Sequence, residues 1–356
     1  MLVAAAIATM LAAQPRRLVA DYGYWSKSDT PSYSAAQVPY DRLTDIIHVG
    51  VSLDPSGDGT LDVPTGFLEP ELIRRAHAAG VKVMILVGGG SELFDDVANS
   101  PQARTRFASA MRDFEDAHGY DGVDIDWEYP QGVREGQDFA ALVTALRLAF
   151  PAPQYLLSAD VAAIPYQVDA DYDFCASLPQ LDFINDMTYD MAGPWTTSAQ
   201  INSPILPDPH DPRPDGSVKR SIDLMEMTYG VPPAMIDVGN PFYGYRYSTV
   251  EDLYDPCKCE GEAAYELYGP YIKPRIDAAG WKREMDWATG NPYLLYGTRK
   301  QPGFITYDDA ASTYRRSTYA LWTRGVGGIF MWSLDADYDG KSQDLFDAMA
   351  AAFAKR

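Results

Sequence analysis

An α/β protein built as a (β/α)8 TIM barrel is the fold that this sequence predicts, and three observations support the prediction. Short apolar runs alternate with amphipathic stretches along the chain. The apolar runs number eight, and eight strand–helix units close naturally into a barrel. The length of 356 residues exceeds that of an ordinary domain but suits such a barrel with an insertion.

The eight apolar runs are the candidate strands. They are expected at Arg17–Tyr24, Asp45–Leu53, Val81–Val87, Gly122–Trp127, Gln154–Asp160, Leu181–Thr188, Met235–Phe242 and Gly327–Trp332. Helical patterns lie between them at Glu69–Ala79, Pro101–His118, Glu135–Phe150, Val218–Tyr229 and Asp309–Arg324. Strands that alternate with helices pair in parallel through right-handed crossovers. A functional site is therefore expected at the carboxyl ends of the strands.

A doubly wound open sheet is the structural alternative. That fold would carry a glycine-rich phosphate loop after its first strand, and none is present there. Gly88-Gly89-Gly90 follows the third candidate strand but lacks the required spacing. We interpret these glycines as a tight exit from the strand.

Residues 248–303 separate the seventh and eighth candidate strands by a much longer gap than any other. The segment has little helical period beyond Glu262–Ala279. We interpret 248–303 as a small α+β subdomain inserted between strands 7 and 8 of a single catalytic domain that spans residues 15–356.

The first 14 residues are expected to be a signal or targeting segment. Met1–Ala13 is almost entirely apolar, too short to cross a bilayer, and similar to the hydrophobic part of a secretory signal. No Lys or Arg precedes the run, which weakens that interpretation. We expect a secreted protein, and no other stretch of the sequence is apolar enough to span a membrane.

The formal net charge of −21 narrows the class of partner. Nucleic acids and anionic membrane surfaces would be repelled by it. A neutral polysaccharide would not, and the 24 Tyr and 7 Trp residues offer flat surfaces for sugar rings as well as core material. We expect a monomer.

The three cysteines carry a weak signal. Cys257 and Cys259 flank one lysine, and Cys175 lies far away. No further pair or nearby His completes a zinc site, so no metal and no cofactor is expected. A single disulfide that involves Cys175 and three free thiols are the two alternatives.

The segment Asp121–Pro130 contains the candidate catalytic carboxyl groups. In a strand, alternate residues share a face, so Asp124, Asp126 and Glu128 point one way and the apolar residues between them point the other. A parallel barrel strand is normally apolar on both faces, and three carboxylates inside the barrel would be unfavourable for stability alone.

Carboxyl groups crowded in a poorly solvated space must share protons. A carboxyl that stays protonated near neutral pH can act as a general acid. Glu128 is closest to the carboxyl end of the strand and so best placed to meet a substrate. A solvated acidic edge strand is contradicted by the flanking apolar residues, and a Mg²⁺ or Ca²⁺ site lacks further oxygen ligands.

The run Asp121-Gly-Val-Asp-Ile-Asp-Trp-Glu128 resembles the D-G-x-D-x-D-x-E signature of glycoside hydrolase family 18, the chitinases and their relatives. Other segments agree in order: Met187-Thr-Tyr-Asp190 resembles the family's M-x-Y-D run, and Gly239–Gly244, Ile305–Asp309 and Gly327–Trp332 resemble later family segments. The resemblance extends from about Leu18 to the C-terminus.

This resemblance implies a catalytic set of Glu128, Asp126, Asp124 and Tyr189. Glu128 would protonate the glycosidic oxygen, and the substrate's own 2-acetamido oxygen would attack the anomeric carbon. Asp126 would orient the acetamido group, Asp124 would share a proton with Asp126, and Tyr189 would hydrogen-bond the acetamido oxygen. The configuration at the anomeric carbon would be retained.

The same resemblance implies a substrate-binding set. Trp332 would form the floor beneath the reacting sugar, and Met187 and Asp190 would line the site. Trp195 would be a platform on the leaving-group side. Tyr129 and Tyr243, like Tyr22, Tyr24 and Trp25, are candidate cleft aromatics that core packing would explain equally well.

Two positions depart from the family pattern. The third strand ends in Leu86-Val-Gly-Gly89 where the family has S-x-G-G, so a serine expected beneath the aspartates is missing. Asp186 stands where the family has an apolar residue, and nothing in the sequence explains it.

The resemblance implies hydrolysis of β-1,4-linked N-acetylglucosamine polymers, with chitin or a chito-oligosaccharide as substrate. An endo-β-N-acetylglucosaminidase acting on N-glycans would share the same acid machinery. A catalytically inactive chitin-binding lectin is the third possibility, but such proteins typically lose the final acid of the motif, and Glu128 is present.

Overall fold

The computed structural model describes residues 15–163, 172–211, 216–298 and 301–355. The expected targeting segment, residues 1–14, lies outside the described residues. In the part of the chain that is described, no helix combines the length and the apolar character needed to cross a membrane.

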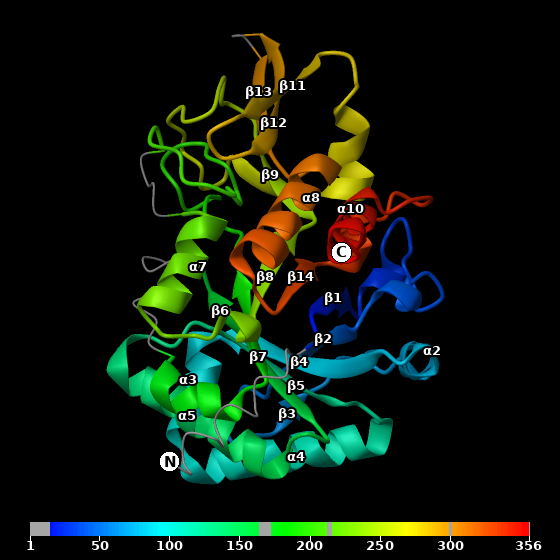
Figure 1. The fold of residues 1–356 in the computed structure, drawn as a ribbon, viewed down its shortest axis with the longest axis vertical. Coiled ribbons are helices and arrows are strands. Elements are labelled where there is room, and N and C mark those ends of the chain that lie inside the picture. Colours follow the sequence, from blue (N-terminus) through cyan, green and yellow to red (C-terminus); the bar gives the residue numbers. More distant parts are fainter. Residues whose placement is uncertain (1–14, 164–171, 212–215, 299–300, 356) are drawn as a thin grey trace, which may run out of the picture.

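Eight parallel strands form a closed barrel (Figure 1). In chain order they are β1 (Arg17–Gly23), β2 (Asp45–Leu53), β4 (Lys82–Gly90), β5 (Gly122–Glu128), β6 (Leu156–Ala162), β7 (Phe183–Met187), β8 (Ile236–Pro241) and β14 (Gly328–Trp332). The barrel closes because β1 pairs with both β14 and β2. A short strand, β3 (Leu61–Asp62), runs antiparallel to the end of β2. The predicted barrel is thereby confirmed.

Helices cover the outside of the barrel. They are α2 (Pro70–Ala79), α3 (Ser91–Asn99), α4 (Pro101–His118), α5 (Gly132–Ala149), α6 (Phe174–Ser177), α7 (Val218–Met227), α8 (Ala310–Thr318), α9 (Leu334–Asp337) and α10 (Asp344–Phe353). Four of the five predicted helices agree to within a few residues. The fifth ends as an α-helix at Thr318 and continues to Arg324 with wider turns. The remaining helices, α3, α6, α9 and α10, were not predicted.

Local sequence signals set several helix ends. Ser100 caps α4 by accepting a hydrogen bond from the Ala103 N–H, and Pro101 occupies the first turn. The same helix ends at Gly119, whose φ of 81° is the left-handed conformation that glycine adopts without penalty. These signals set where α4 begins and ends within the connection between β4 and β5.

The apolar residues divide into two layers. Side chains such as Leu18, Ala20 and Val123 face the helices in the larger core, whereas Val19, Met84 and Phe330 belong to a second cluster inside the barrel. Every second residue of a barrel strand therefore points into the barrel, and the carboxyl groups of β5 are at such positions.

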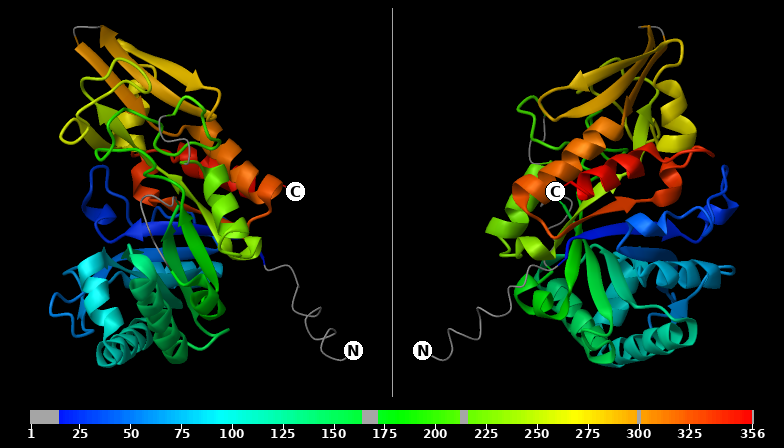
Figure 2. Two further views of the ribbon diagram at one scale, coloured as in Figure 1. Left: turned by 90° about the vertical axis from the view of Figure 1, so that its left-hand side faces the viewer. Right: turned by 45° about the vertical axis from the view of Figure 1, so that its right-hand side comes forward.

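The insertion between the seventh and eighth barrel strands is an antiparallel sheet that projects beyond one end of the barrel (Figures 1 and 2). Its strands are β9 (Tyr243–Tyr247), β10 (Ala263–Leu267), β11 (Trp281–Asp286), β12 (Asn291–Thr298) and β13 (Gln301–Thr306), in the spatial order β10-β9-β13-β12-β11.

The helix expected at Glu262–Ala279 forms only in part. Ala263–Leu267 is a strand, and only the short helical turns Tyr268–Ile272 and Lys273–Arg275 follow it. The difference arises because β10 pairs along its whole length with β9, a partner that local periodicity does not reveal.

Candidate active site

Strand β5 presents its three carboxyl groups to the barrel interior. Val123, Ile125 and Trp127 are fully buried in the core between the sheet and the helices. On the opposite face, Asp124 is fully buried, Asp126 is partly exposed and Glu128 is exposed. Solvent access therefore increases toward the carboxyl end of the strand, where Glu128 is the most accessible of the three carboxyl groups.

A cavity of about 180 Å³ opens beside Glu128. Eight of the predicted site residues line it, namely Asp126, Glu128, Tyr129, Met187, Tyr189, Asp190, Tyr243 and Trp332. Two further lining residues, Asp160 of β6 and Tyr265 of β10, were not predicted. An acid in the middle of an apolar strand could have marked Asp160, whereas nothing in the sequence distinguishes Tyr265 from the other tyrosines.

Asp124 lies beneath the cavity. Its Oδ1 atom accepts hydrogen bonds from the Ser158 hydroxyl of β6 and, at 3.3 Å, from the Asn185 side-chain amide of β7. Burial raises the pKa of Asp124 to about 6, and these hydrogen bonds partly oppose the rise. The neighbour on the other side of Asp124 is Leu86 of β4. The serine that the sequence lacks at position 86 thus has a counterpart on the opposite neighbouring strand.

The two carboxyl groups above Asp124 also hold their protons more tightly than usual. Burial raises the pKa of Asp126 well above its ordinary value, and the negative charges of Glu128 and Asp124 raise it further. The pKa of Glu128 is raised because the cavity walls desolvate its carboxyl, and it is partly lowered by a hydrogen bond with Tyr129. The arrangement favours a protonated carboxyl at the cavity mouth.

Asp190 occupies the other wall of the cavity. It has a φ of 57°, and its N–H donates to the Asn202 side-chain oxygen at 2.9 Å. The Tyr243 and Tyr245 hydroxyls both donate to Asp190 Oδ1, the latter at 2.9 Å. Burial raises the pKa of Asp190 to about 6, and the two tyrosine hydrogen bonds moderate the rise.

The aromatic rings of the cavity are held by contacts within the barrel. The Tyr189 ring packs edge-on against Phe330 of β14, with 6.0 Å between centroids. A Cβ atom at Gly239 would lie 2.7 Å from Tyr189 Cε1, so the glycine leaves space for that ring. Trp332 packs against Trp25 with 6.3 Å between centroids.

Like Asp124, the predicted site residue Trp195 does not line the cavity. Its side chain is exposed, and its ring lies edge-on to Tyr245, whose hydroxyl binds Asp190. Trp195 therefore contacts Tyr245, which in turn binds Asp190 of the cavity wall.

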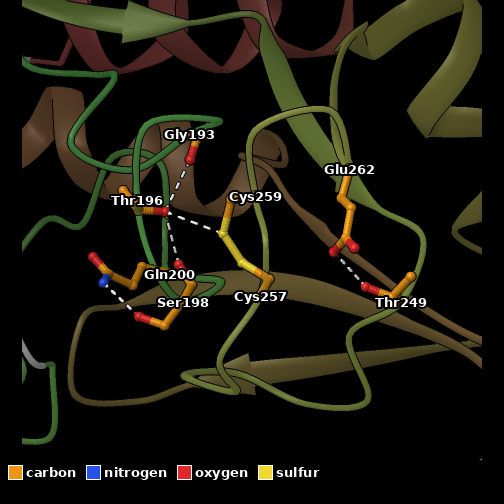
Figure 3. The surroundings of a disulfide bond; sticks show 8 residues. All are labelled: Gly193, Thr196, Ser198, Gln200, Thr249, Cys257, Cys259 and Glu262. Carbon is orange, nitrogen blue, oxygen red and sulfur yellow. Dashed lines mark hydrogen bonds between the residues drawn. A yellow bond between two sulfur atoms is a disulfide. The ribbon is translucent and has the colours of Figure 1, made fainter.

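The loop that carries Trp195 contacts a disulfide (Figure 3). The bond joins Cys257 and Cys259, whose Cα atoms lie 4.9 Å apart, and Cys175 is a free, exposed thiol. Both alternatives drawn from the sequence were wrong, because the chain folds Cys257 and Cys259 toward each other while Cys175 lies on α6. Thr196 donates from its hydroxyl toward Cys259 Sγ at 3.6 Å and lies within 2.8 Å of the Gly193 and Ser198 carbonyl oxygens.

Asp186, unexplained from sequence, faces away from the cavity. Each of its oxygens lies 2.7 Å from the Ser221 hydroxyl of α7, so the carboxyl ties β7 to a covering helix. Burial raises its pKa to about 7.

Among the described residues, no cluster of three or more His, Cys, Asp or Glu side chains could hold a metal ion.

Comparison with known proteins places this geometry in context. The sequence model for glycosyl hydrolases family 18 matches residues 17–337. A "Probable endochitinase" of Caenorhabditis elegans is 30% identical over 300 residues, which cover 78% of this chain and 48% of that protein. An "Endochitinase" of Manduca sexta is 28% identical over 374 residues, which cover 93% of this chain and 66% of that one. The chain thus spans between about half and two thirds of the length of these relatives.

Solved structures share the fold. Catalytic domain 2 of the Ostrinia furnacalis Group II chitinase superposes with a TM-score of 0.86 at 25% identity, covering 96% of this chain and 98% of that chain. The human pseudo-chitinase YKL-39, described as retaining chitooligosaccharide binding, superposes with a TM-score of 0.84 at 22% identity, covering 96% of this chain and all of that one.

Proposed function

Because this chain belongs to glycosyl hydrolases family 18, we propose that it is a chitinase that hydrolyses β-1,4-linked N-acetylglucosamine polymers. The observation that supports the proposal most strongly is the position of Glu128. It is an accessible carboxyl with a raised pKa at the mouth of a cavity that aromatic side chains line. Such a carboxyl can deliver a proton to a glycosidic oxygen.

The proposed mechanism is retaining and substrate-assisted. Glu128 protonates the leaving oxygen while the 2-acetamido oxygen of the substrate attacks the anomeric carbon. Glu128, now a carboxylate, then removes a proton from the water that opens the cyclic intermediate. The two steps return Glu128 to its protonated form.

Asp126 and Tyr189 would position the acetamido group. Both line the cavity with Glu128, and the raised pKa of Asp126 allows it to exchange a proton with Asp124 as its contacts change. Tyr189 would donate to the acetamido oxygen and hold it near the anomeric carbon, which reduces the entropic cost of the attack.

The remaining cavity residues would bind the sugar. Trp332 offers an aromatic face, and Asp190 offers a hydrogen-bond acceptor whose position the two tyrosine hydroxyls determine. The chitin chain is neutral, so the net charge of −21 does not oppose its binding.

We also propose that the protein is exported and acts as a monomer. The apolar run at Met1–Ala13 supports export, and the Cys257–Cys259 disulfide is compatible with an oxidising compartment.

The test is cleavage of chitotetraose and of a high-mannose glycopeptide by the wild type and by Glu128→Gln. The amide keeps the size of the side chain but supplies no proton, so we expect a loss of about 100-fold or more in the cleavage of chitotetraose. Release of the glycan in place of chitotetraose cleavage would identify an endo-β-N-acetylglucosaminidase. Binding of chitotetraose without cleavage of either substrate would identify a lectin and contradict the proposal.

A further inference from the structure

Asp160 is a carboxyl of the cavity that the proposed mechanism does not use. On β6, Leu157, Ala159 and Val161 belong to the core beneath the helices, so Ser158 and Asp160 face the barrel interior. Asp160 lines the cavity, yet only 3% of its surface is exposed. An acid at such a position is unfavourable unless its charge or its proton has a partner.

The groups that surround Asp160 offer it no opposite charge. The titratable neighbours that raise its pKa are Asp124 and Asp126 of β5 and Asp21 of β1, after burial as the largest cause. A negative charge on Asp160 would also raise the pKa values of two nearby phenols, Tyr172 and Tyr189. Among the described residues, no Lys, Arg or His belongs to the groups that shift the pKa of Asp160, and a hydrogen bond with the Asn185 side chain partly lowers that pKa.

Several oxygen atoms of this acidic group have no hydrogen-bond donor. Both oxygens of Asp21, Oδ2 of Asp124, Oδ1 of Asp126 and Oδ1 of Asp160 are buried without any N–H or O–H partner in the described part of the chain. Two carboxylates cannot donate to each other. A neighbouring carboxyl that carries a proton can supply such a donor, and the proton is then shared between the two groups.

The position of that proton follows from the partners of Asp124. Its Oδ1 already accepts from Ser158 and Asn185, so Asp124 is the member of the group best prepared to be an anion. Its Oδ2 is the oxygen still in need of a donor. The neighbouring carboxyl of Asp160 is one of the groups that lower the pKa of Asp124.

We propose that Asp160 is a positioning residue of the active site, whose protonated carboxyl donates a hydrogen bond to Asp124 Oδ2. Donors on both oxygens then stabilise the anion of Asp124 whenever the shared proton lies on Asp126, and Asp126 can turn toward the acetamido group of the substrate. Leu86 cannot donate from the other neighbouring strand, so β6 supplies both Ser158 and Asp160. The role assigned to Asp160 in the reaction rests on the proposed chitinase function.

The first test does not depend on activity. In protein labelled with ¹³C at the aspartate carboxyl carbons, the Asp160 resonance is the one missing from the spectrum of Asp160→Asn. We expect that resonance in the wild type at pH 7 to have the chemical shift of a protonated carboxyl. The shift of an ionised carboxyl at pH 7 would overturn the proposal, whether or not the protein cleaves chitin.

The second test compares Asp160→Asn and Asp160→Ala on chitotetraose. The amide can still donate to Asp124, so we expect Asp160→Asn to keep kcat within about threefold. Asp160→Ala removes the donor, and the loss of one hydrogen bond to a charged group should lower kcat by about 10- to 100-fold with KM little changed. The acid limb of its pH profile should move to higher pH by about half a unit or more, because Asp124 ionises less readily.

The control for these variants is Asp186→Asn. Asp186 is a buried acid on the neighbouring strand whose contacts lie on the helix side, so its replacement should leave kcat and the pH profile unchanged. Wild-type kcat and an unshifted acid limb in Asp160→Ala would refute the proposal. So would an equal loss of kcat in Asp160→Asn and Asp160→Ala, because a positioning donor must be rescued by the amide.

Discussion

The three carboxyl groups of β5 differ because each has its own surroundings. Asp124 is buried and accepts hydrogen bonds, Asp126 lies between two other acids, and Glu128 is exposed at the cavity mouth. Although part of the Glu128 side chain is exposed, the surrounding cavity walls desolvate its carboxyl and raise its pKa, and the Tyr129 hydrogen bond lowers it. The balance between these two effects sets the pH at which the proposed general acid loses its proton.

Replacing Tyr129 with Phe should therefore change the pH dependence of activity. The hydrogen bond favours the carboxylate of Glu128, and its removal raises the pKa of Glu128 further. We expect the basic limb of kcat/KM on chitotetraose to move to higher pH by about half a unit to one unit.

The control is Tyr120→Phe. The Tyr120 hydroxyl lies 2.8 Å from His48 Nδ1 in the core and does not line the cavity, so its removal should leave the basic limb in place. A basic limb that stays in place in Tyr129→Phe would show that Tyr129 does not influence the pKa of Glu128.

Strand β7 connects the site to the helical layer. Asn185 points inward and donates to Asp124, while the next residue, Asp186, points outward to Ser221 of α7. The pKa of Asp186 is raised to about 7 from its ordinary value of 3.8, so the folded protein prefers the protonated carboxyl. The stability that this preference contributes is present below about pH 4 and is lost as the pH rises through about 7.

Asp186→Asn should remove this pH dependence. At pH 4 the variant and the wild type should unfold at similar free energies, because both bury a neutral group. At pH 8.5 the variant should be the more stable by an amount on the order of a few kcal/mol, because only the wild type buries a charge. Urea unfolding of both proteins at the two pH values measures this difference in free energy. A difference that is the same at pH 4 and at pH 8.5 would contradict the prediction.

The site is completed by the sheet that projects from the barrel. Tyr243 of β9 and Tyr265 of β10 both line the cavity, and their rings stack with 4.5 Å between centroids. The barrel supplies the carboxyl groups of the cavity, and the insertion supplies part of its aromatic lining. Substrate affinity and proton transfer are therefore expected to depend on different parts of the chain.

Tyr265→Ala should separate the two contributions. We expect KM for chitotetraose to rise about 5- to 10-fold, because a stacking surface is lost, while kcat changes little. The matched control is Tyr271→Ala, an exposed tyrosine of the same insertion that does not line the cavity, for which KM should not change. An equal rise in KM for both variants, or a fall in kcat for Tyr265→Ala, would show that Tyr265 is not a separate substrate-binding surface.

Much of the barrel and part of the site were predictable from local sequence. The period of two along β5 placed Asp124, Asp126 and Glu128 on one face, and the structure has that alternation. The eight strands and five of the covering helices followed from hydrophobic period, which acts over a few neighbouring positions. The resemblance in Met187–Asp190 and at Trp332 indicated residues that the structure brings to the same cavity.

What the sequence by itself determined is thus which residues share a face of a strand, where the eight barrel strands lie, and where five of the covering helices lie. Only the tertiary structure decided which side chains from distant strands meet. Asp160 and Tyr265 reach the cavity, and Asp186 contacts Ser221, because closure of the barrel and pairing of the inserted sheet bring those segments together. The physical reason is that such contacts depend on non-local register and packing, which leave no periodic pattern in the sequence.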